Sequence, residues 1–86
     1  MKKIKKNNIV SFPNVVSDTE REIEAIIFAS PIPLDEASIE SKIKKKTNIK
    51  KSLENLKNFY SKRGINLVCI SNKWSFRTSE NLSYLM

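Results

Sequence analysis

The sequence contains no histidine, one glycine and one cysteine among its 86 residues. Without histidine, the chain has neither the usual imidazole base nor the commonest zinc ligand. A single glycine excludes a glycine-rich phosphate-binding loop, and Cys69 has no second cysteine with which to form an internal disulfide. We therefore expect no enzyme, no metal site and no bound cofactor.

Long hydrophobic runs are also missing. No stretch approaches the ~20 apolar residues needed to span a bilayer, and the patch at Ile9, Val10 and Phe12 is too short for the core of a signal peptide. These features predict a cytoplasmic protein that does not enter a membrane. A chain of 86 residues makes one small domain, which buries only about 60% of its unfolded surface and gains stability by self-association.

The net charge of +7 is unevenly distributed. Lys2, Lys3, Lys5 and Lys6 lie in a segment without apolar periodicity, so residues 1–17 are expected to form a flexible basic arm. Without these four lysines, 12 basic residues face 9 acidic ones, which leaves +3 for the folded part. The abundance of Ile, Asn and Lys is also what an AT-rich genome would encode. Charge is therefore a weak indication of nucleic-acid binding.

Capping residues divide the middle of the chain into three helical segments. Ser17 and Glu20 have the spacing of a capping box, and Asp35 and Asn48 are good N-caps for the next two helices. These signals predict helices near 19–30, 35–45 and 48–62.

The apolar spacing changes at Gly64. Before it, Leu53 and Leu56 follow a helical period; after it, Leu67 and Cys69 alternate as in a strand. The position of Gly64 behind the last helical residues predicts a left-handed C-terminal cap. Segments 65–70 and 74–78 predict a β-hairpin with a turn at 71–73, where Asn72 tolerates positive φ.

Three helices followed by a hairpin predict an α+β winged-helix domain over residues 18–80, in which the second and third helices form a helix-turn-helix pair. Residues 81–86 are expected to start a truncated linker helix. Cys69 is expected to be a small core side chain. The expected core consists of Ile26, Ile27, Leu53, Leu56, Leu67 and Trp74.

A run of lysines without acidic residues surrounds the predicted turn between the second and third helices. Two interpretations remain: a phosphate-binding surface where helix-turn-helix proteins meet DNA, or an ordinary solvated face. Asn55 on the third helix has the chemistry to contact base edges, but the neighbouring Glu54 disfavours sequence-specific binding. The candidate phosphate contacts are Lys44, Lys45, Lys46, Lys50 and Lys51.

Four segments resemble the bacterial segregation and condensation protein B family. Residues 24–34 (EAIIFASPIPL) resemble its opening helix and the turn after it. Residues 53–60 (LENLKNFY), 63–68 (RGINLV) and 74–78 (WSFRT) are similar to its third helix and its two wing strands. The order and spacing of these segments carry the resemblance, which extends over about residues 19–86.

The resemblance implies a non-catalytic accessory subunit in chromosome condensation, segregation and cell division. It implies a homodimer formed through this N-terminal domain, a kleisin subunit and an SMC ATPase as partners, and association with the nucleoid through that complex. Family members continue into a second winged-helix domain, whereas this sequence stops at Met86. The sequence is therefore expected to represent a domain, a fragment or a truncated product with weakened kleisin binding.

A different class of function follows from the residues alone. A small basic winged helix is typical of a DNA-binding transcriptional regulator. Strong, salt-dependent binding to duplex DNA would favour the regulator, whereas a self-complementary dimer surface would favour the complex subunit. DNA binding by a complex subunit is expected to be at most nonspecific.

Overall fold

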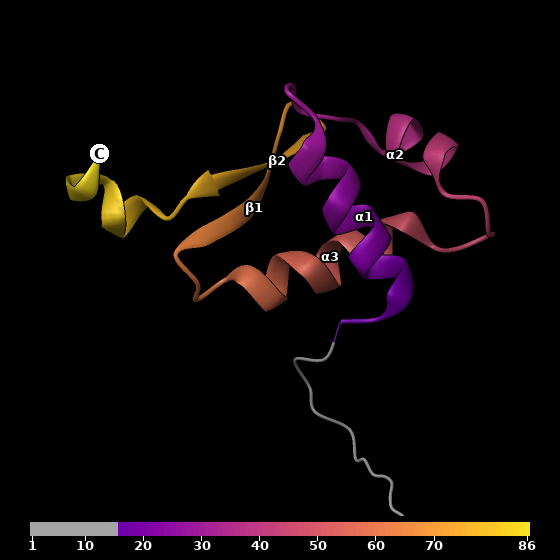
Figure 1. Cartoon of the computed structure of the whole chain (residues 1–86), viewed down its shortest axis with the longest axis horizontal. Coiled ribbons are helices and arrows are strands. Elements are labelled where there is room, and N and C mark those ends of the chain that lie inside the picture. The colour runs from indigo at the N-terminus through magenta and orange to yellow at the C-terminus, as the bar shows by residue number, and fades with distance from the viewer. Residues whose placement is uncertain (1–15) are drawn as a thin grey trace, which may run out of the picture.

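The computed structural model describes residues 16–86 and has a winged-helix-like arrangement of three helices followed by an antiparallel hairpin (Figure 1). The expected basic arm lies almost wholly outside the described residues. The fold class expected from the sequence is confirmed. In chain order the elements are α1 (Asp18–Ala29), α2 (Glu36–Lys42), α3 (Ile49–Tyr60), β1 (Ile65–Ile70), β2 (Lys73–Thr78) and the 3-10 helix η2 (Glu80–Leu85).

Each of the three α-helices begins at a polar side chain that accepts a backbone hydrogen bond. Ser17 and Glu20 form a reciprocal capping box at α1. Asn48 accepts from the Lys51 amide at 3.1 Å, and Asp35 accepts from the Ser38 amide at 2.8 Å. The hydrogen bond from the backbone amide of Ser38 holds the pKa of Asp35 below its ordinary value. The hydrogen bond from the Ser38 side chain lowers this pKa further, by a smaller amount.

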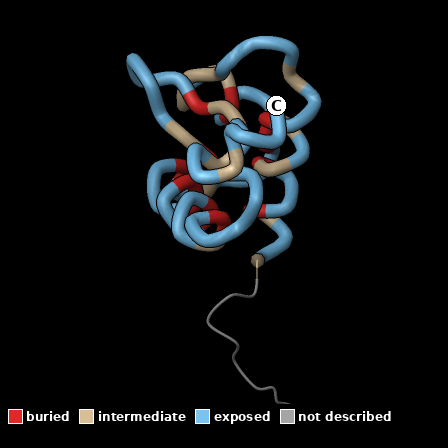
Figure 2. Tube along the Cα trace, turned by 90° about the vertical axis from the view of Figure 1, so that its left-hand side faces the viewer, coloured by how far each residue is buried: buried red, intermediate tan, exposed pale blue. Residues whose placement is uncertain are grey.

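The core lies where the three helices meet the inner face of the hairpin, as the buried segments in Figure 2 show. Ile26, expected to be buried, is only partly buried at the edge of this core. On α1 the buried face follows Glu20, Ile23 and Ile27, and Ile26 lies off that line by part of a turn. The buried apolar residues are Ile23, Ile27, Ile39, Ile43, Ile49, Leu53, Leu56, Tyr60, Leu67 and Trp74.

The hairpin is fastened to the loop between α1 and α2. Leu34 and Trp74 form an isolated antiparallel bridge, with N–H to O distances of 3.0 and 2.7 Å. β1 pairs with the other side of β2, so β1 is the outer strand. Ile70 pairs with Lys73, and both intervening residues, Ser71 and Asn72, have positive φ, as a type I′ turn requires.

The expected burial of Cys69 is wrong. Cys69 and Ile65 share the inner sheet face with Leu67, yet Cys69 is exposed and Ile65 is 42% exposed. Leu67, in the middle of β1, is the residue that reaches the core. Cys69 lies nearer the turn, where it lines an open hollow beside Ala37. Alternation identified the face correctly, but the helices cover only the middle of the strand.

Gly64 does not form the left-handed cap expected from the sequence. Among the described residues no glycine has positive φ, and the C-cap of α3 is Ser61 in the right-handed region. Gly64 instead lies against the C-terminal segment: its carbonyl accepts from the Ser79 amide at 2.8 Å. A Cβ at position 64 would lie 3.4 Å from Cδ1 of Leu82. A side chain at position 64 would therefore meet Leu82 at an ordinary contact distance.

This geometry predicts that Gly64→Ala is tolerated. Alanine accepts the backbone conformation, and its methyl group would meet Leu82 at an ordinary contact distance. Because alanine also restricts the unfolded chain, we expect the free energy of unfolding to change by less than about 1 kcal/mol, with a tendency toward stabilisation. Urea denaturation measures this change. A loss well above that size would show that position 64 needs the left-handed conformation after all.

Candidate interaction surfaces

A hydrogen bond between side chains joins α1 to α3. It involves Asn55, which the sequence analysis considered for contacts to base edges. The Asn55 side-chain amide donates to Glu20 Oε2 at 2.9 Å. The other carboxylate oxygen of Glu20 accepts from the Ser17 amide at 3.0 Å, and Glu20 is buried. The amide of Asn55 is therefore engaged within the domain, which counts against Asn55 as a base-reading residue. From the sequence, Glu20 was predicted to accept a hydrogen bond in the capping box of α1. Its second hydrogen bond, from Asn55, was not predicted.

A second contact joins α1 and α3 one turn further along. The Tyr60 hydroxyl donates to Glu24. The Tyr60 ring meets Phe59 and Phe76 edge-on, with centroids 5.2 and 5.1 Å apart. The Arg63 guanidinium lies 4.5 Å above the centroid of Phe59. Together these contacts hold the end of α3 against both α1 and the hairpin.

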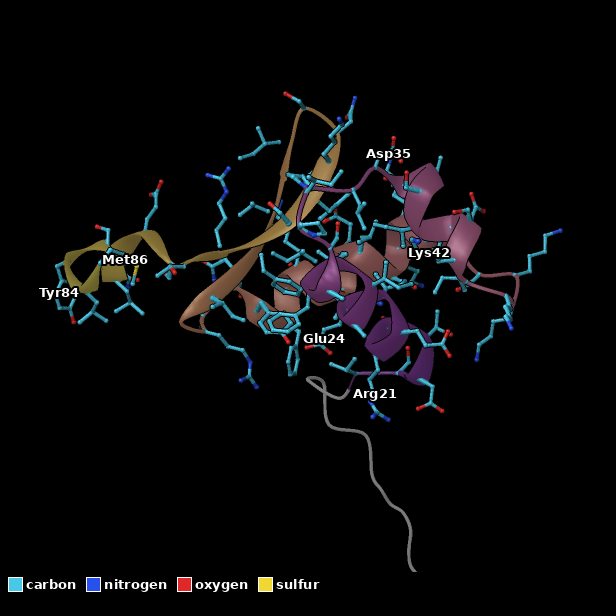
Figure 3. The ribbon with its side chains drawn as sticks, turned by 45° about the horizontal axis from the view of Figure 1, so that its top comes forward. Arg21, Glu24, Asp35, Lys42, Tyr84 and Met86 are labelled. Carbon is cyan, nitrogen blue, oxygen red and sulfur yellow. The ribbon has the colours of Figure 1, made fainter. Side chains whose placement is uncertain are left out.

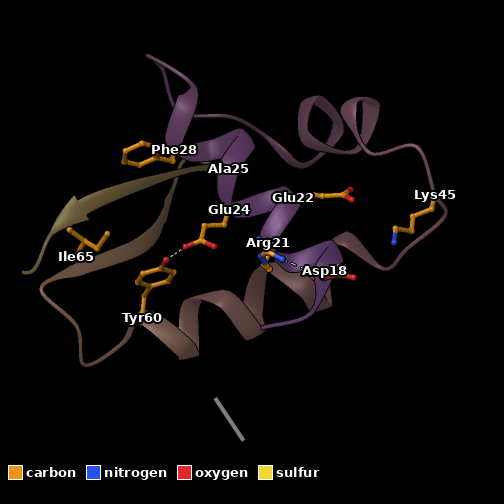
Figure 4. A pocket seen from close by; sticks show the side chains of 9 residues that line it. All are labelled: Asp18, Arg21, Glu22, Glu24, Ala25, Phe28, Lys45, Tyr60 and Ile65. Carbon is orange, nitrogen blue, oxygen red and sulfur yellow. Dashed lines mark hydrogen bonds and ion pairs between the residues drawn. The ribbon is translucent and has the colours of Figure 1, made fainter. Parts of the chain in front are cut away.

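The outer face of α1 carries a groove that combines apolar and charged residues (Figure 4). Phe28 on α1 and Ile65 on β1 lie toward one end, and Lys45 lies toward the other. Phe28 is 76% exposed, because it follows Ile27 and so points away from the buried face. The lining residues are Asp18, Arg21, Glu22, Glu24, Ala25, Phe28, Lys45, Tyr60 and Ile65.

The C-terminal segment carries a second set of exposed apolar side chains. Tyr84 is 78% exposed, and Leu85 and Met86 are exposed as well. Figure 3 shows Tyr84 and Met86 at the end of η2 that lies away from the helices. Phe28 and Tyr84 are thus two equally exposed aromatic residues on distant parts of the domain.

The lysines singled out in the sequence surround the start of α3. Lys44, Lys45 and Lys46 lie in the connection after α2, and Lys50 and Lys51 lie in the first turn of α3; all five are exposed. The first turn of α3 contains no acidic residue. Cations at this positive end of a helix are unfavourable, by roughly 0.3–1 kcal/mol each. We call Lys42, Lys44, Lys45, Lys46, Lys50 and Lys51 the lysine surface.

A metal centre and a membrane span are two further features that residues 16–86 could provide. No group of three or more His, Cys, Asp or Glu residues in that range is arranged to hold a metal ion. No helix in the same part of the chain is long and apolar enough to cross a membrane. The features of the described surface that stand out are thus the groove, the C-terminal apolar residues and the lysine surface.

Comparisons with known proteins identify a family and a fold. The family model described as "Segregation and condensation complex subunit ScpB" matches residues 21–86. A crystal structure of a conserved hypothetical protein from Chlorobium tepidum is similar, with a TM-score of 0.68 and 21% identity. The alignment covers 78% of this chain and 44% of that one, so the present chain spans less than half of the solved protein. At this identity the likeness concerns the fold alone. No curated protein matches the sequence.

The contact between Glu20 and Asn55 makes a prediction about stability. Glu20→Ala removes both the capping-box acceptor and the partner of Asn55, so we expect a loss of about 1–3 kcal/mol in the free energy of unfolding. Glu22→Ala removes the same charge from an exposed position of the same helix and should change stability by less than about 0.5 kcal/mol. Urea denaturation compares the two, and equal losses would contradict a specific role for Glu20.

Proposed function

This chain belongs to the family of segregation and condensation complex subunits ScpB, and we propose that it is a non-catalytic accessory subunit of a bacterial complex between a kleisin and an SMC ATPase. In this proposal the protein acts in the cytoplasm, on the chromosome, through its partners. The observation that carries the proposal is the family match over residues 21–86, which extends from within α1 to the end of η2. The engagement of Asn55 with Glu20 disfavours a sequence-reading regulator.

Self-association is the part of this function that we assign to the described domain. The groove on α1 offers Ala25, Phe28 and Ile65 as apolar contacts. Its charged residues are of both signs, with Arg21 and Lys45 near Asp18 and Glu22. A twofold dimer needs a surface that complements itself, and a surface with both signs of charge meets that requirement. The occupant we propose for the groove is therefore the same groove of a second copy.

The lysine surface is a poor candidate for the dimer interface. A twofold axis through it would bring lysines of one copy against the same lysines of the other. Like charges that face each other oppose association. The two surfaces share Lys45, and of the two the groove on α1 is the better candidate for self-association.

A pair of matched substitutions tests this assignment. Phe28→Glu places a charge in the groove, and we expect the dimer dissociation constant to rise at least tenfold because a buried charge there would lack a partner. Tyr84→Glu introduces the same charge at an equally exposed aromatic residue of the C-terminal segment and should leave association unchanged. Sedimentation equilibrium measures both. A monomeric parent at high micromolar concentration, or equal weakening by the two substitutions, would contradict the proposed interface.

Membership of a kleisin–SMC assembly has its own test. Immunoprecipitation of the tagged chain after cross-linking in its own cells should recover the kleisin and the SMC ATPase together, because an accessory subunit is held by the assembled complex. An unrelated cytoplasmic protein that carries the same tag is the control. Recovery of neither partner, with the chain present and folded, would refute the proposed role in the complex while leaving the self-association result intact.

A further inference from the structure

We propose that the lysine surface binds the phosphate backbone of duplex DNA without sequence preference. This contact differs from the proposed self-association, since it involves the connection between α2 and α3 and the first turn of α3. Of the six lysines, Lys45 alone also lines the groove on α1. It would place a subunit of a chromosome-condensing complex in direct contact with DNA.

The lysines of this surface have no partner among the described residues. The ion pair found within 4.0 Å in residues 16–86 joins Arg21 and Asp18, at 3.7 Å. Six lysines thus lie between positions 42 and 51 with their charges uncompensated by contact. Glu22 of α1 lines the same hollow as Lys42, Lys44 and Lys45, so the least opposed positive charge lies toward Lys46 and α3.

The lysines of this surface repel one another, and two of them are also repelled by the end of a helix. Lys50 and Lys51 lie in the first turn of α3, whose backbone N–H groups already give that end a positive partial charge. Lysines at the positive end of a helix lower the stability of the fold, but they attract anions. We therefore expect an anion to bind at this end of α3. Phosphates along a duplex would relieve the repulsion, and each phosphate contact would release a counterion.

The surroundings favour DNA over an anionic membrane. Membrane-surface binding combines basic residues with apolar side chains that enter the bilayer interface. Between positions 42 and 51 both apolar residues, Ile43 and Ile49, are buried in the core, so the segment that carries the lysines exposes no large apolar side chain. Ile26, which lines the hollow beside Lys42, Lys44 and Lys45, is itself partly buried. The exposed large apolar residues of the described chain lie elsewhere. Exposed lysines at the start of the second helix of a helix-turn-helix pair lie where such proteins contact the DNA backbone.

The same elements explain why we expect no sequence preference. Base reading from α3 requires free donors and acceptors on its exposed side. Asn55 donates to Glu20, and the exposed Glu54 next to it adds a negative charge that phosphates repel. Contacts to phosphates position a protein but carry no sequence information.

The experiment compares two variants of equal charge by fluorescence anisotropy with a random-sequence duplex of about 20 base pairs. The test variant carries Lys46→Gln, Lys50→Gln and Lys51→Gln, three lysines that do not line the groove on α1. The control carries Lys57→Gln, Lys62→Gln and Lys73→Gln, which removes three exposed lysines outside the lysine surface. A third variant replaces Lys2, Lys3 and Lys5 by Gln, because the basic N-terminal segment is the main competitor for the same ligand. Circular dichroism confirms that each variant is folded.

We expect the test variant to lose at least tenfold in affinity at low salt and the control less than threefold. The slope of log affinity against log salt should fall by about 2–3 in the test variant, since about 0.9 counterion is released per phosphate contact. Equal losses in test and control, or a larger loss in the N-terminal variant, would overturn the proposal. So would a strong preference for one duplex sequence, or binding to phosphatidylserine vesicles with no binding to DNA.

Discussion

The backbone bridge between Leu34 and Trp74 is the constraint on which the rest of the domain depends. It is made of two hydrogen bonds between the loop after α1 and Trp74, near the end of β2 that follows the hairpin turn. The bridge fixes the hairpin relative to α1, and Trp74 and Leu67 on the inner face of the sheet are buried in the core that the helices share. An isolated two-stranded hairpin is only marginally stable, so attachment to the helices is what gives the wing a defined position.

The helices and strands could be predicted from local sequence signals. The predictions that were wrong concern Cys69 and Gly64, whose surroundings depend on how the elements pack together. Capping residues Ser17, Asp35 and Asn48 predicted the helix starts because their hydrogen bonds are local. Alternation identified the inner face of β1 but could not show that the helices cover Leu67 and leave Cys69 open. Gly64 was assigned the wrong role because a glycine that follows a helix in sequence need not adopt the left-handed conformation. In the folded chain its φ is not positive, and a Cβ would meet Leu82 at an ordinary contact distance.

The candidate surfaces were predicted to different degrees. The lysine surface was visible as a run of charge, and the structure adds that its members lack ion-pair partners in the described chain. The groove was not predicted, because it combines α1 with residues from the connection after α2, from α3 and from β1. The engagement of Asn55 also required a contact between residues 35 positions apart in the sequence. Long-range side-chain pairing is the information that the sequence pattern lacks.

The outer position of β1 has a consequence for how this protein aggregates when it unfolds. Its six residues, Ile-Asn-Leu-Val-Cys-Ile, contain no charge and no proline, although 29% of the whole chain is charged. Natural proteins usually guard an edge strand with lysine, proline or a bulge, because unpaired backbone groups recruit strands from other molecules. β1 contains neither lysine nor proline, and its composition favours β-structure between molecules. When the hairpin detaches from the helices on heating, β1 is therefore the segment expected to nucleate aggregation, which net positive charge on the rest of the domain opposes.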